Sequence, residues 1–180
     1  MSDVTPGDVV AFWREAGPAK WFRGGAEFDA QFRSGFLAAH EAAAAGRLDP
    51  WQDHAEGALA LLLLLDQFPR NAFRGTPRVY ATDARAREVA DAAIRADFDR
   101  AVEAELRPFF YLPFTHSEAL PDQERSVALN GPVGGESLRW ALHHRDVVRR
   151  YGRFPHRNAV LGRASTPDEE RFLAEGGFTG

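Results

Sequence analysis

The chain has 180 residues, 44% of them hydrophobic, and it carries a formal net charge of −4 at pH 7. This size and composition predict one compact domain over residues 1–180. The acidic balance argues against a general nucleic-acid-binding protein. The absence of cysteine excludes disulfides and thiolate zinc sites.

The chain also lacks the marks of export and membrane insertion. The N-terminal stretch MSDVTPGDVV has neither the basic nor the apolar region of a secretory signal. The longest apolar run, residues 58–65, is far shorter than the roughly 20 residues that a membrane span requires. We therefore expect a cytoplasmic protein with neither a membrane nor a nucleic acid as its partner.

Helix starts are marked by a capping residue followed by proline, at Thr5-Pro6, Asp49-Pro50 and Thr166-Pro167. Glu169 stands three residues after Thr166 and completes a capping box. Asp83 predicts a further start.

The apolar pattern follows the helical period along the chain. Phe28, Phe32 and Phe36 form one stripe in a predicted helix over 26–47, which Gly46 ends. The next predicted helix, 50–68, is apolar all round and is therefore expected at the centre of the fold. It should end at Phe68, because proline follows. Further helices are predicted at 84–99, 118–130, 136–152 and 167–175. No period-two pattern of β-branched residues is present, so the fold class is all-α.

Two connections, 69–82 and 106–117, are long for a helical bundle and rich in aromatic residues. We expect them to be loops that pack on the surface of the helices. Loops of this kind often carry function.

Polar side chains gather around the first Phe-Pro pair, in the stretch LLDQFPRNAFRG. Arg70, Asn71 and Arg74 follow the expected helix end, where they could bind a ligand or cap the last carbonyl groups. Asp66 lies in a helix that is apolar all round, so its carboxylate needs a partner.

A second such end is the stretch RRYGRFPHRNAVLGR, which begins at Arg149 in the last turn of the predicted helix 136–152. Its candidate ligand-binding residues are Arg153, His156, Arg157 and Asn158. Within the helix, His144 falls inside the apolar arc, while His143 lies on the opposite face. His144 is either a hydrogen-bonded core residue or part of an inward-facing polar site.

The aromatic stretch FFYLPFTHSE ends in further polar residues. His116 and Glu118 could act as acid and base, because histidine titrates near neutrality and a partly desolvated glutamate can approach it. They could equally be a structural pair, with Ser117 as the N-cap of the next helix.

Cofactor and metal motifs are lacking. The sequence has no Gly-rich phosphate loop, no HExxH and no Glu-x-x-His pair of the di-iron kind. A metal site can be drawn through His116, Glu118, Asp122 and His143 or His144, but it is the less favoured interpretation. We expect no cofactor and no metal.

Three blocks of the sequence resemble a known family. The blocks DQFPRNAFRGTPRVYATD, FFYLPFTHSE with DQERSV, and RYGRFPHRNAVLGRASTPDEERFL are similar to the signature blocks of a bacterial family of unknown function. The resemblance implies an all-helical, tetratricopeptide-like domain. It implies no activity, cofactor or catalytic residue.

The sequence therefore favours a site for an anionic small molecule or peptide carboxylate in an Arg/His-lined cleft. Its predicted ligand-binding residues are Asp66, Arg70, Asn71, Arg74, His144, Arg153, His156, Arg157 and Asn158. The first alternative is a scaffold of tetratricopeptide type, in which the arginines only cap helices and bridge loops. The second is an acid–base enzyme using His116 and Glu118, so the sequence alone does not decide whether the protein is an enzyme.

Overall fold

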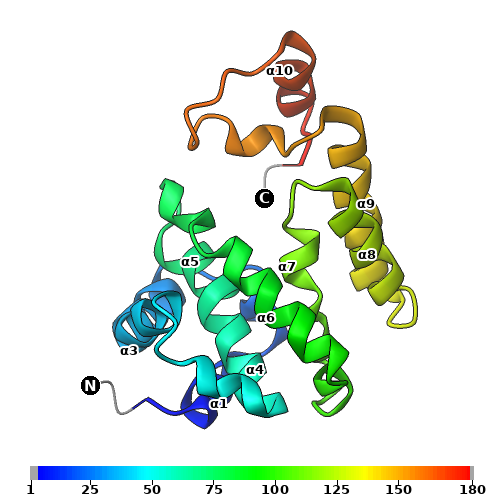
Figure 1. Ribbon diagram of the computed structural model, residues 1–180. Helices are drawn as coiled ribbons and strands as arrows, with labels where there is room; N and C mark the ends of the chain where they lie inside the picture. The colour runs from blue at the N-terminus through cyan, green and yellow to red at the C-terminus, as the bar shows by residue number, and fades with distance from the viewer. Residues whose placement is uncertain (1–3, 179–180) are drawn as a thin grey trace. The chain divides into compact units, whose positions relative to one another are not determined.

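The structure is a computed structural model that describes residues 4–178. Every regular element in this part of the chain is helical (Figure 1), which confirms the all-α prediction. The elements are α1 (Pro6–Ala16), α2 (Pro18–Trp21), α3 (Ala26–Ala44), η1 (Asp49–Asp53), α4 (Ala55–Leu62), η2 (Leu63–Gln67), α5 (Phe68–Ala72), η3 (Pro77–Tyr80), α6 (Asp83–Arg95), η4 (Phe98–Arg100), η5 (Arg107–Phe110), α7 (Leu112–Thr115), α8 (Leu120–Asn130), α9 (Gly135–Tyr151), η6 (Pro155–Arg157) and α10 (Pro167–Ala174).

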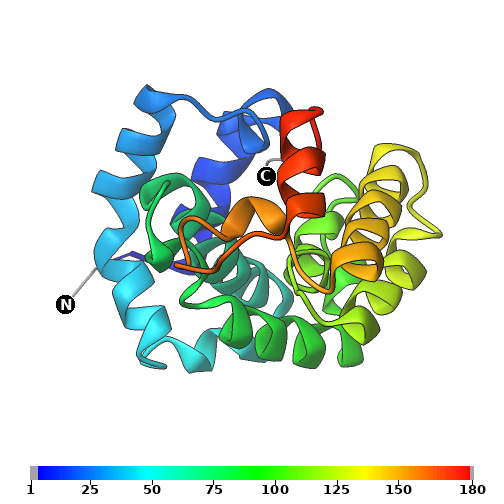
Figure 2. The ribbon, with the colours of Figure 1, turned by 90° about the horizontal axis from the view of Figure 1, so that it is seen from above.

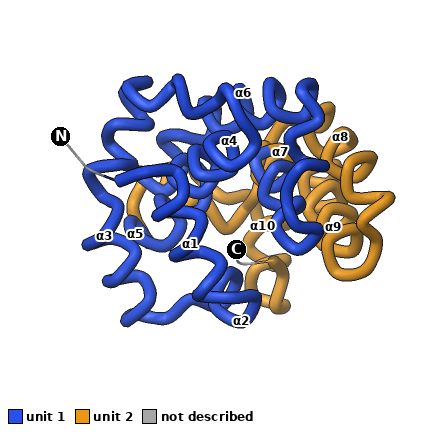
Figure 3. Tube along the Cα trace, turned by 90° about the horizontal axis from the view of Figure 1, so that it is seen from below, with its two compact units in different colours: residues 1–74, 78–113 blue, residues 75–77, 114–180 orange. Residues whose placement is uncertain are grey.

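The chain divides into two compact units, shown in different colours in Figure 3. Unit 1 comprises residues up to 74 together with 78–113, and unit 2 comprises 75–77 and the chain from 114 onward. Each unit is described by itself. That residues 1–180 form one domain stays a prediction.

Unit 1 is built around α4 and η2, the segment that the sequence marks as central. Every residue from Gly57 to Pro69 is buried, as expected of a helix that is apolar all round. Helices α1 and α6 pack on α4, and α3 packs on η2 and α5. The stripe of Phe28, Phe32 and Phe36 on α3 contacts Phe12 of α1, with ring centroids 5.2–5.4 Å apart.

The predicted end of the central helix at Phe68 is wrong. The chain widens into one π-helical turn, η2, and then continues as α5 through Pro69 to Ala72. Proline has no N–H to donate, so the carbonyl group of Leu65 would lack its helical donor. The hydroxyl of Thr82 donates to that oxygen at 2.6 Å, and Nδ1 of His40 donates to the Leu64 oxygen at 2.9 Å. The wider turn therefore accommodates the proline, because side chains from outside the helix satisfy the carbonyl groups.

The beginning of the central helix also differs from the prediction. Asp49 and Pro50 start a short 3-10 helix, η1, and α4 begins only at Ala55. His54 is the N-cap of α4, since its Nδ1 accepts the Gly57 N–H at 2.9 Å. The predicted helix over 26–47 ends near its expected place, and Gly46 adopts a left-handed φ of 75° there.

The two connections are more ordered than expected. They contain α5, η3, η5 and α7 in place of continuous loop. They pack on the helices as expected, and most of their aromatic residues are buried: Phe109 and Phe110 are 2% and 0% exposed, and Phe109 packs edge-on against Trp13 at 5.4 Å.

Unit 2 contains the helical hairpin of α8 and α9, which lie side by side in both views (Figures 1 and 2). The last helix, α10, begins at the predicted capping box of Thr166 and Glu169. Val147, Val148 and Phe154 form a small core, which Tyr151, Phe172 and Phe178 extend. Gly152, with φ 69°, ends α9, so the second Phe-Pro pair follows the helix and does not terminate it.

The sequence suggested Ser117 as the N-cap of α8, but the structure does not place it there. The N-cap residue is Ala119, which makes no side-chain cap. The Ser117 hydroxyl instead donates to Asp122 at 2.6 Å and accepts the Ala119 N–H at 3.2 Å. It therefore fixes the turn that precedes the helix.

Candidate functional site

Arg70 lies on α5 in unit 1, where it joins two buried carboxylates. Its guanidinium donates two hydrogen bonds to Asp83, at 2.9 and 3.1 Å, and lies 3.1 Å from Oδ1 of Asp66. The Asp66 residue is 1% exposed, and this contact supplies the partner that its carboxylate requires. Burial alone would lower the pKa of Arg70, but the charges of Asp66 and Asp83 outweigh it and raise the pKa.

Asn71 and Arg74 belong to a neighbouring network of the same unit. The amide group of Asn71 donates to the Gln67 carbonyl at 2.9 Å and accepts from Arg74 at 3.1 Å. Arg74 donates two hydrogen bonds to Asp29 at 2.7 and 3.2 Å, while 57% of its side chain stays exposed. Both residues therefore link α5 to its surroundings through hydrogen bonds within the protein.

Arg153 in unit 2 is bound to Glu169 of α10. Two hydrogen bonds of 2.6 and 2.7 Å join the guanidinium to the carboxylate, which is also an acceptor for the Thr166 N–H at 2.7 Å. The hydrogen bonds from Arg153 hold the pKa of Glu169 at about 2, although burial acts in the opposite direction. The capping glutamate thus also binds the loop that follows α9.

Glu118 occupies the centre of a second such network. Its carboxylate accepts two hydrogen bonds from Arg163, at 2.7 and 2.9 Å, and a third from the Phe154 N–H at 2.8 Å. Burial raises the pKa of Glu118, but these three donors outweigh it, so the pKa lies below its ordinary value. Arg163 also donates to Asn158 at 3.0 Å, and Asn158 is 1% exposed.

The histidines of unit 2 lie close together among aromatic rings. His116 and His144 have ring centroids 6.4 Å apart, and Phe178 lies 4.5 Å from His144 and 5.0 Å from His156. Nδ1 of His144 donates to the Trp140 carbonyl at 2.7 Å. Nδ1 of His156 is buried and has no hydrogen-bond partner among the described residues.

Burial keeps two of these imidazoles neutral. It lowers the pKa of His144 to about 3, with the positive charges of His116, His143 and Arg157 acting in the same direction. Burial also lowers the pKa of His156 to about 4, followed by the charge of Arg157.

Arg157 is a cation at the centre of this group. It is 7% exposed, and its guanidinium lies over the Phe154 ring at 4.6 Å. Its Nη2 donates to the His116 carbonyl at 2.8 Å. Arginine keeps its charge even when it is buried, so the neighbouring imidazoles lie in its positive field.

The predicted site residues are divided between the two units. Asp66, Arg70, Asn71 and Arg74 belong to unit 1, while His116, Glu118, His144, Arg153, His156, Arg157 and Asn158 belong to unit 2. That the two groups form a single cleft stays a prediction. Within residues 4–178 no three His, Asp or Glu side chains are placed to hold a metal ion.

Sequence reasoning missed the partners that hold these groups in place. Asp83, Glu169 and Arg163 were read only as parts of helices or loops, although each binds a predicted site residue. The polar segment PDQERSVALN predicts that Gln123 faces polar partners or water, but not which ones; it is fully buried and donates to the carbonyl groups of Thr115 and Ser117 at 2.7 and 2.6 Å. A buried carboxylate signals that a partner exists, but the spacing along the chain does not identify it.

No helix in the described part of the chain is both long and apolar enough to span a bilayer. No curated protein matches the sequence. A solved structure of a protein of unknown function from Agrobacterium tumefaciens is 55% identical, covers 95% of this chain and 97% of its own, and superposes with a TM-score of 0.94. The family model described as "Bacterial protein of unknown function (DUF924)" matches residues 9–177. This match spans nearly the whole sequence, and the chain therefore belongs to that bacterial family.

Proposed function

We propose that the protein binds an anionic small molecule or a peptide carboxylate at a histidine–arginine cluster in unit 2. The cluster consists of His116, His144, His156 and Arg157. The observation that carries the proposal is the positive field of the buried Arg157. This charge is the second cause, after burial, of the lowered pKa of His156. It contributes less to the lowered pKa of His144, where burial comes first and the charge of His116 second. A site whose field disfavours a second positive charge favours an anion.

The surroundings of the cluster support binding because they fix its backbone. Glu118 accepts the Phe154 N–H and is held by Arg163, while Arg153 is held by Glu169. These contacts fix the segment 153–158 at Arg153 and Phe154. A ligand that binds to a segment already ordered loses less conformational entropy from the protein.

The proposal narrows the set of residues that face a ligand. Arg70, Arg74 and Arg153 each make two hydrogen bonds to a carboxylate of the protein. We therefore assign these three arginines the role of holding the structure around the site. Arg157 and the histidines are the residues that contact the ligand. Asp66, Asn71 and Asn158 also fall in the supporting set, because each is hydrogen-bonded to another group of the protein.

The test is anion-dependent thermal stabilisation of the full chain with phosphate, sulfate, citrate and a short peptide with a free carboxylate. Stabilisation should grow with ligand concentration, because a ligand that binds only the native state shifts the unfolding equilibrium. Arg157→Gln should abolish the effect. The control is Arg149→Gln, at an exposed arginine of the same unit that pairs with Glu124, and it should leave the effect intact.

A second measurement uses the unaltered protein, so its result does not depend on whether a variant folds. In the unaltered protein, NMR titration should show the pKa of His144 and His156 rising when the anion is present, since a bound negative charge stabilises the imidazolium form. Unchanged histidine titrations, together with no stabilisation by any of these anions, would exclude the cluster as an anion site.

The scaffold alternative is favoured by one specific observation. The carboxylate pairs of Arg70, Arg74 and Arg153 are what a network that only fastens loops would contain. The helical hairpin of α8 and α9 fits a tetratricopeptide-like arrangement, which remains part of this alternative. A scaffold predicts no response to any anion and a large loss of stability in Arg153→Ala.

Acid–base catalysis by His116 and Glu118 receives less support. The three donors to Glu118 lower its pKa, whereas a general acid at neutral pH requires a raised one. If screening finds an activity, His116→Gln should reduce kcat far more than it changes KM.

A further inference from the structure

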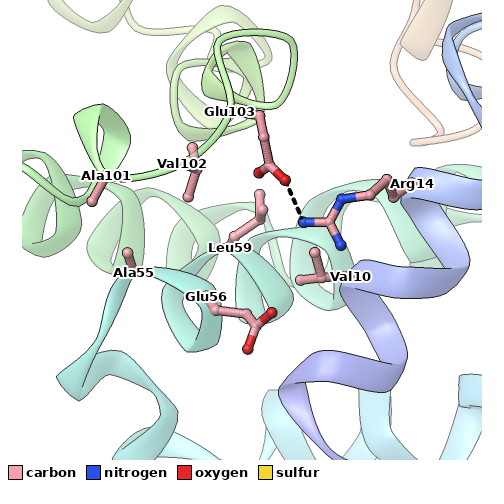
Figure 4. Close-up of a pocket in the computed structure, with 8 residues that line it drawn as sticks. All are labelled: Val10, Arg14, Ala55, Glu56, Leu59, Ala101, Val102 and Glu103. Atoms are coloured by element: carbon pink, nitrogen blue, oxygen red, sulfur yellow. Dashed lines mark hydrogen bonds and ion pairs between the residues drawn. The ribbon is translucent and has the colours of Figure 1, made fainter.

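A pocket of about 140 Å³ lies in unit 1, away from the residues that the sequence singles out (Figure 4). Helix α1, the beginning of α4 and the segment 101–103 surround it. Its lining consists of Val10, Arg14, Ala55, Glu56, Leu59, Ala101, Val102 and Glu103. A cavity of this size can hold a group comparable to benzene, of about six heavy atoms.

The floor of the pocket is aliphatic. Val10 and Leu59 are each 1% exposed, so they form the packed base of the pocket and offer almost no free surface. The accessible apolar atoms belong to Ala55 and Val102, which are half-buried, and to the exposed Ala101. Ala55 and Ala101 are small and leave the space above that base open. A flexible alkyl chain matches such a floor, because every methylene that it buries contributes about 0.8 kcal/mol.

The rim of the pocket carries a surplus of negative charge. Arg14 donates to Glu103 at 2.7 Å, and this pair closes one side (Figure 4). Glu56 lies on another side, in the first turn of α4, and its side chain makes no hydrogen bond or ion pair with any described residue. The lining therefore holds two carboxylates and one guanidinium.

We propose that this pocket binds an aliphatic ammonium group, with its alkyl chain against Ala55, Ala101 and Val102 and its charged end between Glu56 and Glu103. The surplus of carboxylates favours a cationic ligand. The aliphatic lining favours an alkylammonium ion over a hydrated metal ion. A lysine side chain of another protein and a free polyamine share this chemistry. The proposal is independent of the anion site in unit 2.

The experiment uses NMR of the full chain with methyl groups observed at Val10, Leu59 and Val102. The probes are n-butylammonium, spermidine and lysine blocked at both ends, and n-butanol is the neutral control. All three amines should shift these methyl signals with dissociation constants of about a millimolar, because the pocket takes only about six heavy atoms of each. Added salt should weaken the effect, because the rim charges are exposed. The absence of shifts, or equal shifts with butanol, would overturn the proposal.

Variants distinguish the contribution of the rim charge to amine binding from that of the shape of the pocket. Glu56→Gln should weaken butylammonium binding about twofold to fivefold, the range for one exposed ion pair. The matched control is Glu27→Gln, because Glu27 also stands exposed in the first turn of a helix but lies outside the pocket. Ala101→Trp should fill the pocket and abolish binding of every amine. Equal affinities of the Glu56 and Glu27 variants would refute the role of the rim charge.

The same titrations identify the source of the ammonium group. Tighter binding of blocked lysine than of spermidine supports the proposal with a protein as the partner. The reverse order supports it with a free polyamine as the ligand.

Discussion

Arg70 shows at the scale of one residue how much a partly buried cation contributes to unit 1. It binds Asp83 through two hydrogen bonds and Asp66 through a third contact, and Asp66 is nearly inaccessible to solvent. A guanidinium between two buried carboxylates offsets the cost of taking their charges out of water.

Replacing Arg70 with alanine should therefore cost about 3–5 kcal/mol of unfolding free energy, because two carboxylates would lose their buried counter-ion. Arg74→Ala is the matched control. The Arg74 side chain is 57% exposed and that of its partner Asp29 18%, so the loss should be smaller, about 1 kcal/mol. Urea denaturation of both variants measures the difference, and equal losses would contradict the structural role assigned to Arg70.

Part of this residue-scale arrangement could be read from the sequence. An aspartate in an apolar helix predicts a partner of opposite charge, and Arg70 stands four residues after Asp66, on the same helical face. Asp83 was not predictable as the second carboxylate. It lies thirteen residues further on, at the start of another helix, and only the packing of α6 brings it there.

At the scale of elements, the π-turn η2 explains why the chain can pass Pro69 without ending the helix. The sequence correctly indicated the buried helix, since its apolar run is complete, and it correctly marked proline as a disturbance. It could not show that the helix continues. The donors that satisfy the Leu64 and Leu65 carbonyl groups come from His40 and Thr82, on other segments.

This account makes Thr82 a support of the central helix. Thr82→Val keeps the shape of the side chain but removes the hydroxyl that donates to Leu65, so unfolding free energy should fall by about 1–3 kcal/mol. Ser34→Ala is the control, because its exposed hydroxyl donates to a carbonyl group of its own helix. Denaturant unfolding distinguishes them, and a Thr82 variant as stable as the control would show that water satisfies the carbonyl group.

Across the whole molecule, many carboxylates are paired with arginine, while several histidines stay neutral. Of the 22 basic residues only Lys20 is a lysine, a composition typical of GC-rich genomes. Yet Arg70, Arg153 and Arg163 occupy partly buried positions, where a planar guanidinium can hold a carboxylate with two hydrogen bonds. These arginines therefore also stabilise the fold.

The neutral histidines set the response of the molecule to acid. Burial lowers the pKa of His40 in unit 1 and of His144 and His156 in unit 2. In the unfolded chain these groups take up protons below about pH 6.5, whereas the folded pKa is about 3 for His144 and about 4 for His156. The unfolded state thus binds more protons in this range, and stability falls as the pH falls.

Between pH 7.5 and 5.5 the loss from His144 alone should be about 1 kcal/mol. The carboxylates with lowered pKa, such as Glu118 and Glu169, add their losses only below about pH 4.5, the ordinary range of a glutamate. Urea unfolding at both pH values measures the change.

His144→Asn keeps a donor for the Trp140 carbonyl but cannot titrate, so its stability should depend less on pH by that amount. His40→Asn should reduce the dependence in the same direction. If either variant kept the full pH dependence of the unaltered protein, the histidine that it replaces would not be buried in its neutral form.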